Sequence, residues 1–259
     1  MTEFAEFKTG IDVFDSQIGG LPSGLIFLLE EVGAGGREFA LTTLMKLAKS
    51  GFENLYYFAI SSTVDEIKRE LTLTFPKSGN EWIDKIDIKS FSKDFFAKTV
   101  VPLSWLDVEV GLSALKKGDL LRNLFDGFEK VGDNSVLLID SFIDLVRKTD
   151  VLGGNELSWR DLVDFVTGLR KFIIKKNMLV YCLMTKDVVG KAKEEELISS
   201  SDGVIVFEFL HGKEMVKRSM FIRKLLGALP ILERRGIMRF DISFDPSEGF
   251  IISRLQRIV

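Results

Sequence analysis

A glycine-rich segment near the N-terminus has the residue types and spacing of a phosphate-binding loop. The apolar run Leu25–Leu29 leads into a turn that contains Gly33, Gly35 and Gly36, and apolar residues at helical spacing follow from Phe39 to Ala48. This order predicts a buried strand, a tight loop and an amphipathic helix. Such an arrangement presents backbone N–H groups to a phosphate at the start of the helix. The predicted geometry is that of a P-loop.

The side chains of this loop depart from the phosphate-binding signature G-x-x-x-x-G-K-[ST]. That signature requires a lysine for the β- and γ-phosphates and a hydroxyl for Mg²⁺. Here Glu30 replaces the first glycine, Gly36 replaces the lysine and Arg37 replaces the hydroxyl. The carboxylates of Glu30, Glu31 and Glu38 add negative charge, and each unscreened pair with a phosphate charge would cost about 1 to 4 kcal/mol at about 4 Å.

Two interpretations of the loop follow. In the first, the Arg37 guanidinium turns back, replaces the lysine and grips a phosphate through two hydrogen bonds. In the second, the loop keeps its shape for folding reasons and nucleotide turnover is lost. We favour the second, because Thr42 and Thr43 lie more than one helical turn too far along the chain to supply the missing hydroxyl.

A second stretch that could contribute to a chemical site is the apolar run Ser135–Ile139, which is followed by Asp140. A parallel sheet places the carboxyl ends of its strands at the edge where α/β proteins bind ligands. Asp140 is therefore a candidate for one of two roles: it holds Mg²⁺ through water beside the glycine-rich loop, or it is a hydrogen-bond acceptor at the sheet edge. No cluster of His, Cys and carboxylate residues has the spacing of a metal site.

Composition places the chain among globular proteins without generic affinity for nucleic acid. Its 259 residues are 46% hydrophobic and 28% charged, with a net charge of −3. Cys182 is the only cysteine, which excludes an internal disulfide and favours a reducing compartment; it is predicted to be a core residue. His211 is expected at a hairpin turn. Because neither an export signal nor a membrane-spanning run is present, we expect a cytoplasmic protein without membrane contact.

The order of apolar segments predicts one α/β domain over residues 1–259, with a mainly parallel central sheet flanked by helices and antiparallel strands at its C-terminal edge. Residues 76–111 are not assigned, apart from a possible short strand at 86–88. The parallel strands are expected at 25–29, 54–60, 135–139 and 177–184, the helices at 64–71, 112–131 and 157–174, and the antiparallel strands at 203–209, 216–223, 238–243 and 249–253.

Six motifs in this order resemble the RecA superfamily, and within it the archaeal KaiC-like and RadA-like proteins. They are the segment Thr9-Gly10-Ile11, the turn GGLPSG, the glycine loop, LLIDSF, SSSDGVIVFEF, and the closing KRSMFIRKLLG with FDPSEGFII. The resemblance implies a RecA-like P-loop NTPase fold and assembly into oligomers. It also implies ATP or ADP binding with Mg²⁺ at Gly33, Gly35, Gly36, Arg37, Glu38, Asp140 and Lys224, with Asp140 as the metal ligand.

Other departures from the family pattern concern catalysis. The family often has acidic residues where this chain has Ser61-Ser62, and a serine does not replace a carboxylate as general base. Lys224 matches a lysine that reaches across the subunit interface, whereas Leu226 replaces its arginine partner. Because phosphoryl transfer depends on positioning and charge neutralisation, we expect a KaiC-like pseudo-ATPase that acts as a regulatory or scaffolding subunit. It would form a homo-oligomer or join an active paralogue.

Two rival functions stay open at this point. One is an ATP-binding, KaiC-like or RadA-like ATPase that uses Arg37 in place of the lysine. The other is a DNA recombination accessory, for which a basic patch is conceivable although not favoured. The resemblance also raises the possibility of a cis peptide bond after Asp140. The residues that could form the basic patch are Arg234, Arg235 and Arg239, or Lys213, Lys217 and Arg218.

Overall fold

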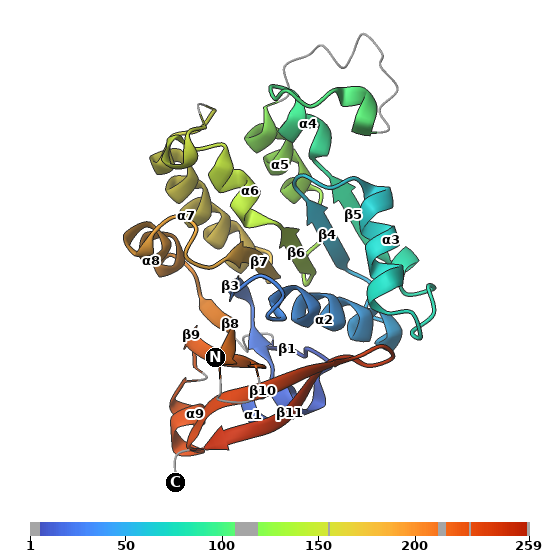
Figure 1. Ribbon diagram of the computed structural model, residues 1–259, viewed down its shortest axis with the longest axis vertical. Coiled ribbons are helices and arrows are strands. Elements are labelled where there is room, and N and C mark those ends of the chain that lie inside the picture. The colour runs from blue at the N-terminus through green and yellow to red at the C-terminus, as the bar shows by residue number, and fades with distance from the viewer. Residues whose placement is uncertain (1–5, 107–118, 155, 212–215, 228, 258–259) are drawn as a thin grey trace.

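A nine-stranded sheet with helices on both faces forms the framework of the protein (Figure 1). The computed structural model describes residues 6–106, 119–154, 156–211, 216–227 and 229–257. The strand order is β11-β10-β9-β8-β3-β7-β6-β4-β5. Strands β3 to β8 pair in parallel, and β8 to β11 pair in antiparallel fashion. The predicted α/β fold, with a mainly parallel sheet and antiparallel strands at its C-terminal edge, is thereby confirmed.

The described strands are β1 (Glu6–Phe7), β2 (Leu21–Pro22), β3 (Gly24–Glu30), β4 (Leu55–Ala59), β5 (Ile86–Ser90), β6 (Val136–Asp140), β7 (Leu179–Thr185), β8 (Gly203–His211), β9 (Val216–Leu225), β10 (Ile237–Asp245) and β11 (Gly249–Arg257). The α-helices are α1 (Asp12–Ile18), α2 (Gly36–Ser50), α3 (Val64–Thr74), α4 (Ser92–Phe96), α5 (Leu120–Glu129), α6 (Phe142–Arg147), α7 (Trp159–Lys175), α8 (Lys191–Ser199) and α9 (Leu229–Arg234). Short 3-10 helices lie at Ile83–Lys85, Leu103–Leu106 and Asp150–Leu152.

Strand β3 lies inside the sheet and is buried on both faces, which explains its continuous apolar sequence. Ile26 and Leu28 point into the core beneath α1, α2 and α3. Leu25, Phe27 and Leu29 point into the core beneath α4 to α8. Because side chains alternate between the two faces of a strand, β3 contributes to both hydrophobic cores.

Helix α2 follows β3 directly and is covered on its outer side by the C-terminal hairpin. Figure 1 shows β10 and β11 reaching along α2. The buried Phe250 N–H donates to Thr42 Oγ1 at 2.8 Å, and Lys46 forms an ion pair with Glu248. The hairpin thus fixes the position of the helix that begins at the glycine loop.

The structure contains elements that the sequence did not predict, and one predicted helix has different bounds. Helix α1 was not predicted; it is stabilised by Asp15, whose carboxylate accepts hydrogen bonds from the N–H groups of Thr9 and Gly10. Part of the helix predicted at 112–131 lies outside the described residues, and α5 begins at Leu120 because Asp119 caps it. The unassigned stretch contains β5, α4 and two 3-10 helices.

The predicted surroundings of two single residues are confirmed. Cys182 is fully buried in β7. His211 ends β8 and pairs with Val216, at the end of a hairpin. Within the described part of the chain, no helix is both long and apolar enough to span a membrane.

Candidate functional site

The glycine-rich loop connects the carboxyl end of β3 to the start of α2, as predicted. Gly33 and Gly35 have positive φ angles of 82° and 118°, a region that favours glycine. Gly35 leaves no room for a side chain, because a Cβ there would lie 2.8 Å from Phe244 Cζ. The loop therefore makes a tight turn that depends on glycine.

The Glu30 carboxylate lies inside this turn, at the first N–H groups of α2. Its Oε2 accepts hydrogen bonds from the N–H of Gly36 at 2.9 Å and from the N–H of Arg37 at 3.2 Å. Burial raises the pKa of Glu30 to about 7; the two backbone hydrogen bonds oppose this rise, and the negative charges of Glu38 and Asp140 add to it. A side chain of this protein therefore occupies the position at which a helix N-terminus binds an anion.

The Arg37 guanidinium points across the sheet edge to the end of β6. Its Nε donates to Asp140 Oδ2 at 2.8 Å and its Nη2 donates to the Tyr57 hydroxyl at 2.9 Å. A further ion pair joins Nη1 to Glu70. Burial lowers the pKa of Arg37, but the charges of Asp140 and Tyr57 and the hydrogen bonds to them together outweigh burial, and the net pKa is raised. Arg37 is thus a fixed cation with three partners of its own chain.

Asp140 lies at the sheet edge, as predicted, but its surroundings do not suit Mg²⁺. Its Oδ2 accepts hydrogen bonds from Arg37 and from the Tyr57 hydroxyl. The position of the Mg²⁺-binding hydroxyl carries the Arg37 guanidinium instead. In the described ranges, no group of three His, Cys, Asp or Glu residues could hold a metal ion. The peptide bond between Asp140 and Ser141 is cis.

A buried carboxylate that the sequence analysis missed stands beside the serine pair after β4. Asp144, in the first turn of α6, accepts a hydrogen bond from Ser61 Oγ at 2.6 Å. Burial raises the pKa of Asp144, while Ser61 and the nearby Arg147 oppose the rise. The Arg147 guanidinium donates to Asp144 Oδ1 at 3.2 Å. This carboxylate is therefore bound from two sides by its own chain.

Lys224 does not lie with the other predicted site residues. It pairs with Val204 near the start of β8, whereas Glu30 pairs with Phe207 further along the same strand. Its Nζ donates to carbonyl oxygens at the end of α8 and just beyond, Ser199 at 2.9 Å and Ser201 at 2.5 Å. By contrast, Glu38 lies in the first turn of α2. The structure thus brings together Gly33, Gly35, Gly36, Arg37, Glu38 and Asp140, and leaves Lys224 apart.

Three of the basic residues considered for a nucleic-acid patch, Arg218, Arg239 and Arg235, have contacts within the chain. Arg218 donates from Nε to the Gly33 carbonyl at 2.9 Å and stacks on Phe244, with 5.0 Å from its Cζ to the ring centre. Arg239 forms an ion pair with Glu208, and Arg235 Nη1 donates to the Gln17 carbonyl at 2.8 Å. Lys213 lies outside the described residues.

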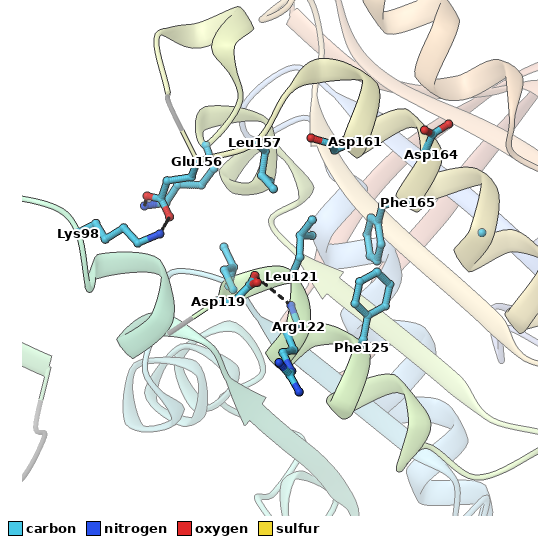
Figure 2. A pocket seen from close by; sticks show the side chains of 13 residues that line it. Lys98, Asp119, Leu121, Arg122, Phe125, Glu156, Leu157, Asp161, Asp164 and Phe165 are labelled. Carbon is cyan, nitrogen blue, oxygen red and sulfur yellow. Dashed lines mark hydrogen bonds and ion pairs between the residues drawn. The ribbon is translucent and has the colours of Figure 1, made fainter. Parts of the chain in front are cut away.

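A cavity of about 820 Å³ lies between α5 and α7, and none of the predicted site residues lines it (Figure 2). Phe125 and Phe165 pack edge to face on one side of the cavity, with ring centres 5.4 Å apart. Across from them, Glu156 contacts Lys98 and Lys148. None of the residues of the glycine-rich loop lines this cavity, so it does not add chemistry to the loop.

Comparison with known proteins supports the fold. No protein-family model matches the chain, and no curated protein matches it. Among solved structures, it resembles the crystal structure of a KaiC-like protein from the hyperthermophilic archaeon Pyrococcus horikoshii OT3, with a TM-score of 0.67 and 19% identity. The match covers 97% of this chain and 100% of that one. At this identity the likeness establishes a KaiC-like fold.

Proposed function

We propose that this protein is a KaiC-like pseudo-ATPase that acts as a regulatory or scaffolding subunit and does not turn over nucleotide. The observation that carries the proposal is the ion pair between Arg37 and Asp140, with 2.6 Å from Nη2 to Oδ2. A guanidinium attached to the chain neutralises the carboxylate that would otherwise face Mg²⁺. Phosphoryl transfer needs that metal to neutralise charge on the phosphates.

The remaining scaffold supports a role in assembly. The sheet, the glycine turn and the C-terminal hairpin that covers α2 are all present, whereas the lysine and the hydroxyl are replaced. The proposed partners are further copies of this chain or an active paralogue, and the proposed location is the cytoplasm. Sedimentation analysis over a range of protein concentrations tests self-association, and co-purification with a catalytically active KaiC-like protein tests the mixed assembly.

Calorimetric titration with ATP and with ADP, each with and without Mg²⁺, tests the proposal most directly. We expect no Mg²⁺-dependent binding up to millimolar nucleotide and no phosphate release. Micromolar binding that strengthens with Mg²⁺ would instead support an ATPase that uses Arg37 as phosphate ligand. In that case R37A should abolish binding, and the proposal of a pseudo-ATPase would be withdrawn.

A further inference from the structure

The side chain of Glu30 lies next to the position that a side chain at residue 36 would occupy. Glu30 is the last residue of β3 and is held in register by pairing with Thr185 on one side and Phe207 on the other. Its backbone carbonyl also accepts the Lys186 N–H at 2.9 Å. The position of Glu30 is therefore set by the centre of the sheet, and its side chain reaches from there into the turn.

Glu30 lies close to the space that a side chain at position 36 would need. A Cβ at position 36 would lie 3.0 Å from Glu30 Oε2 and 3.2 Å from Glu30 Cβ, and on its other side 3.0 Å from Phe207 Cδ2. These distances are tighter than ordinary van der Waals contact. A lysine at position 36 and a glutamate at position 30 would therefore compete for the same space. The two departures from the phosphate-binding signature are therefore neighbours in space.

The Glu30 carboxylate also accepts hydrogen bonds from the N–H donors of the turn. Its Oε2 accepts the N–H groups of both Gly36 and Arg37, in the first turn of α2, where N–H groups have no partner within the helix. The residue before them, Gly35, has no side chain to cap the helix. A carboxylate at this end is favoured by the helix dipole, as a phosphate would be.

We propose that Glu30 is an internal plug of the glycine-rich turn, which excludes both oxyanions and a lysine side chain from that turn. This inference rests on the proposed function, since it explains how the turn persists without nucleotide. The excluded ligands are phosphate groups such as those of a polyphosphate, whose oxygens accept several N–H groups at once.

A double-mutant cycle on stability tests the competition for space without any ligand. The variants are E30G, G36A and the double variant, compared with the wild type by urea unfolding. Because alanine favours helix more than glycine does, G36A should raise the urea midpoint when residue 30 is glycine. With Glu30 present, G36A should lower it. Phe207 is the same in both backgrounds, so the difference isolates Glu30. An equal effect of G36A in both backgrounds would overturn the plug.

Binding of tripolyphosphate, measured calorimetrically without Mg²⁺, tests the exclusion of anions. We expect no binding by the wild type, detectable binding by E30G, and roughly tenfold tighter binding by E30G/G36K because the lysine adds a charge-assisted hydrogen bond. E30A serves if E30G unfolds, and circular dichroism verifies the fold of each variant. If the folded variants bind no better than the wild type, the plug is refuted. The proposed function fails by a different result, namely Mg²⁺-dependent nucleotide binding or hydrolysis by the wild type.

Discussion

Arg37 Nε lies 2.8 Å from Asp140 Oδ2, and this contact joins the start of α2 to the end of β6 across 103 positions of sequence. The two side chains are largely buried, with 24% and 10% of their surfaces exposed. In a nucleotide-hydrolysing site, the carboxylate at this strand end helps to position a metal ion. Here a cation of the chain itself satisfies it, so the Asp140 carboxylate has a charged partner in the absence of nucleotide.

Removal of the Arg37 guanidinium should destabilise the protein. R37A leaves the Asp140 carboxylate in a mostly buried position with Tyr57 as its remaining partner. Breaking a fully buried pair costs about 3 to 5 kcal/mol, and the partial exposure of Arg37 reduces our expectation to about 2 kcal/mol. Urea unfolding provides the measurement.

The matched control is R160A, which breaks the pair between Arg160 and Asp164 on the surface of α7. Those side chains are 89% and 72% exposed, and an exposed pair contributes about 0 to 1 kcal/mol. If R37A and R160A shift the unfolding free energy equally, the Arg37–Asp140 contact carries no special weight.

The pH dependence of stability should carry a signature of Glu30. Its pKa is about 7 in the folded protein, against an ordinary value of 4.5. The folded state therefore holds the proton more tightly than the unfolded state, and the stability that this provides is lost as pH rises from about 4.5 to about 7. The difference in pKa corresponds to a loss of about 3 kcal/mol.

E30Q isolates this contribution, because glutamine keeps the shape of the side chain and does not titrate in this range. The free energy of unfolding of the wild type should fall relative to that of E30Q across this interval and run parallel to it above about pH 8. Other shifted carboxyl groups, such as Asp144, are common to both proteins and cancel in the difference. Parallel curves throughout the range would show that Glu30 titrates normally.

The fold could be predicted from the sequence because buried strands and helices have a simple pattern of apolar residues. β3 had to be apolar at every position from Leu25 to Leu29, since both of its faces are covered. The antiparallel strands were equally accessible, because turn residues separate short apolar runs. Helix α1 was missed since it depends on Asp15 hydrogen bonds rather than on a long amphipathic repeat.

The partners of Arg37 could not be predicted from the sequence in this way. Tyr57 and Glu70 approach it only because β4 lies beside β6 in the sheet and α3 follows β4. The available signal was the Tyr57 hydroxyl, since a buried hydroxyl needs a hydrogen-bond partner, but the neighbouring Tyr56 of the same strand carries a hydroxyl as well. Asp144 gave no signal, because its contact with Ser61 joins segments 83 positions apart.

The two glycines of the turn should respond differently to substitution. Gly33 faces open space, so G33A meets only the strain of a positive φ, about 1 kcal/mol. In G35A the same strain is joined by a clash with Phe244 and with Ile242 Cδ1, which would lie 3.1 Å from the new Cβ. We expect a loss of about 3 kcal/mol. Thermal unfolding of both variants makes the comparison, and equal losses would contradict the close approach of the C-terminal hairpin.

Lys224 could stabilise its own chain or contact a neighbouring subunit, and substitution of this lysine separates the two roles. Its ammonium group donates to carbonyl groups at the end of α8, where a cation is favoured by the helix dipole. K224M should therefore lower the free energy of unfolding by about 1 to 2 kcal/mol, because these carbonyls lose a charged donor. K171M, at an exposed position on α7, is the control and should have little effect.

The dependence on protein concentration decides between the two roles of Lys224. A cap of the chain's own helix acts within one molecule, so the loss in K224M should be the same in dilute and concentrated protein. An intersubunit contact would act through assembly, and the loss would then grow with protein concentration as oligomers form. A loss confined to concentrated samples, accompanied by weaker self-association in sedimentation, would show that Lys224 leaves the α8 carbonyls to bind a partner. We expect the first result, because three carbonyl oxygens already lie within 3.4 Å of its Nζ.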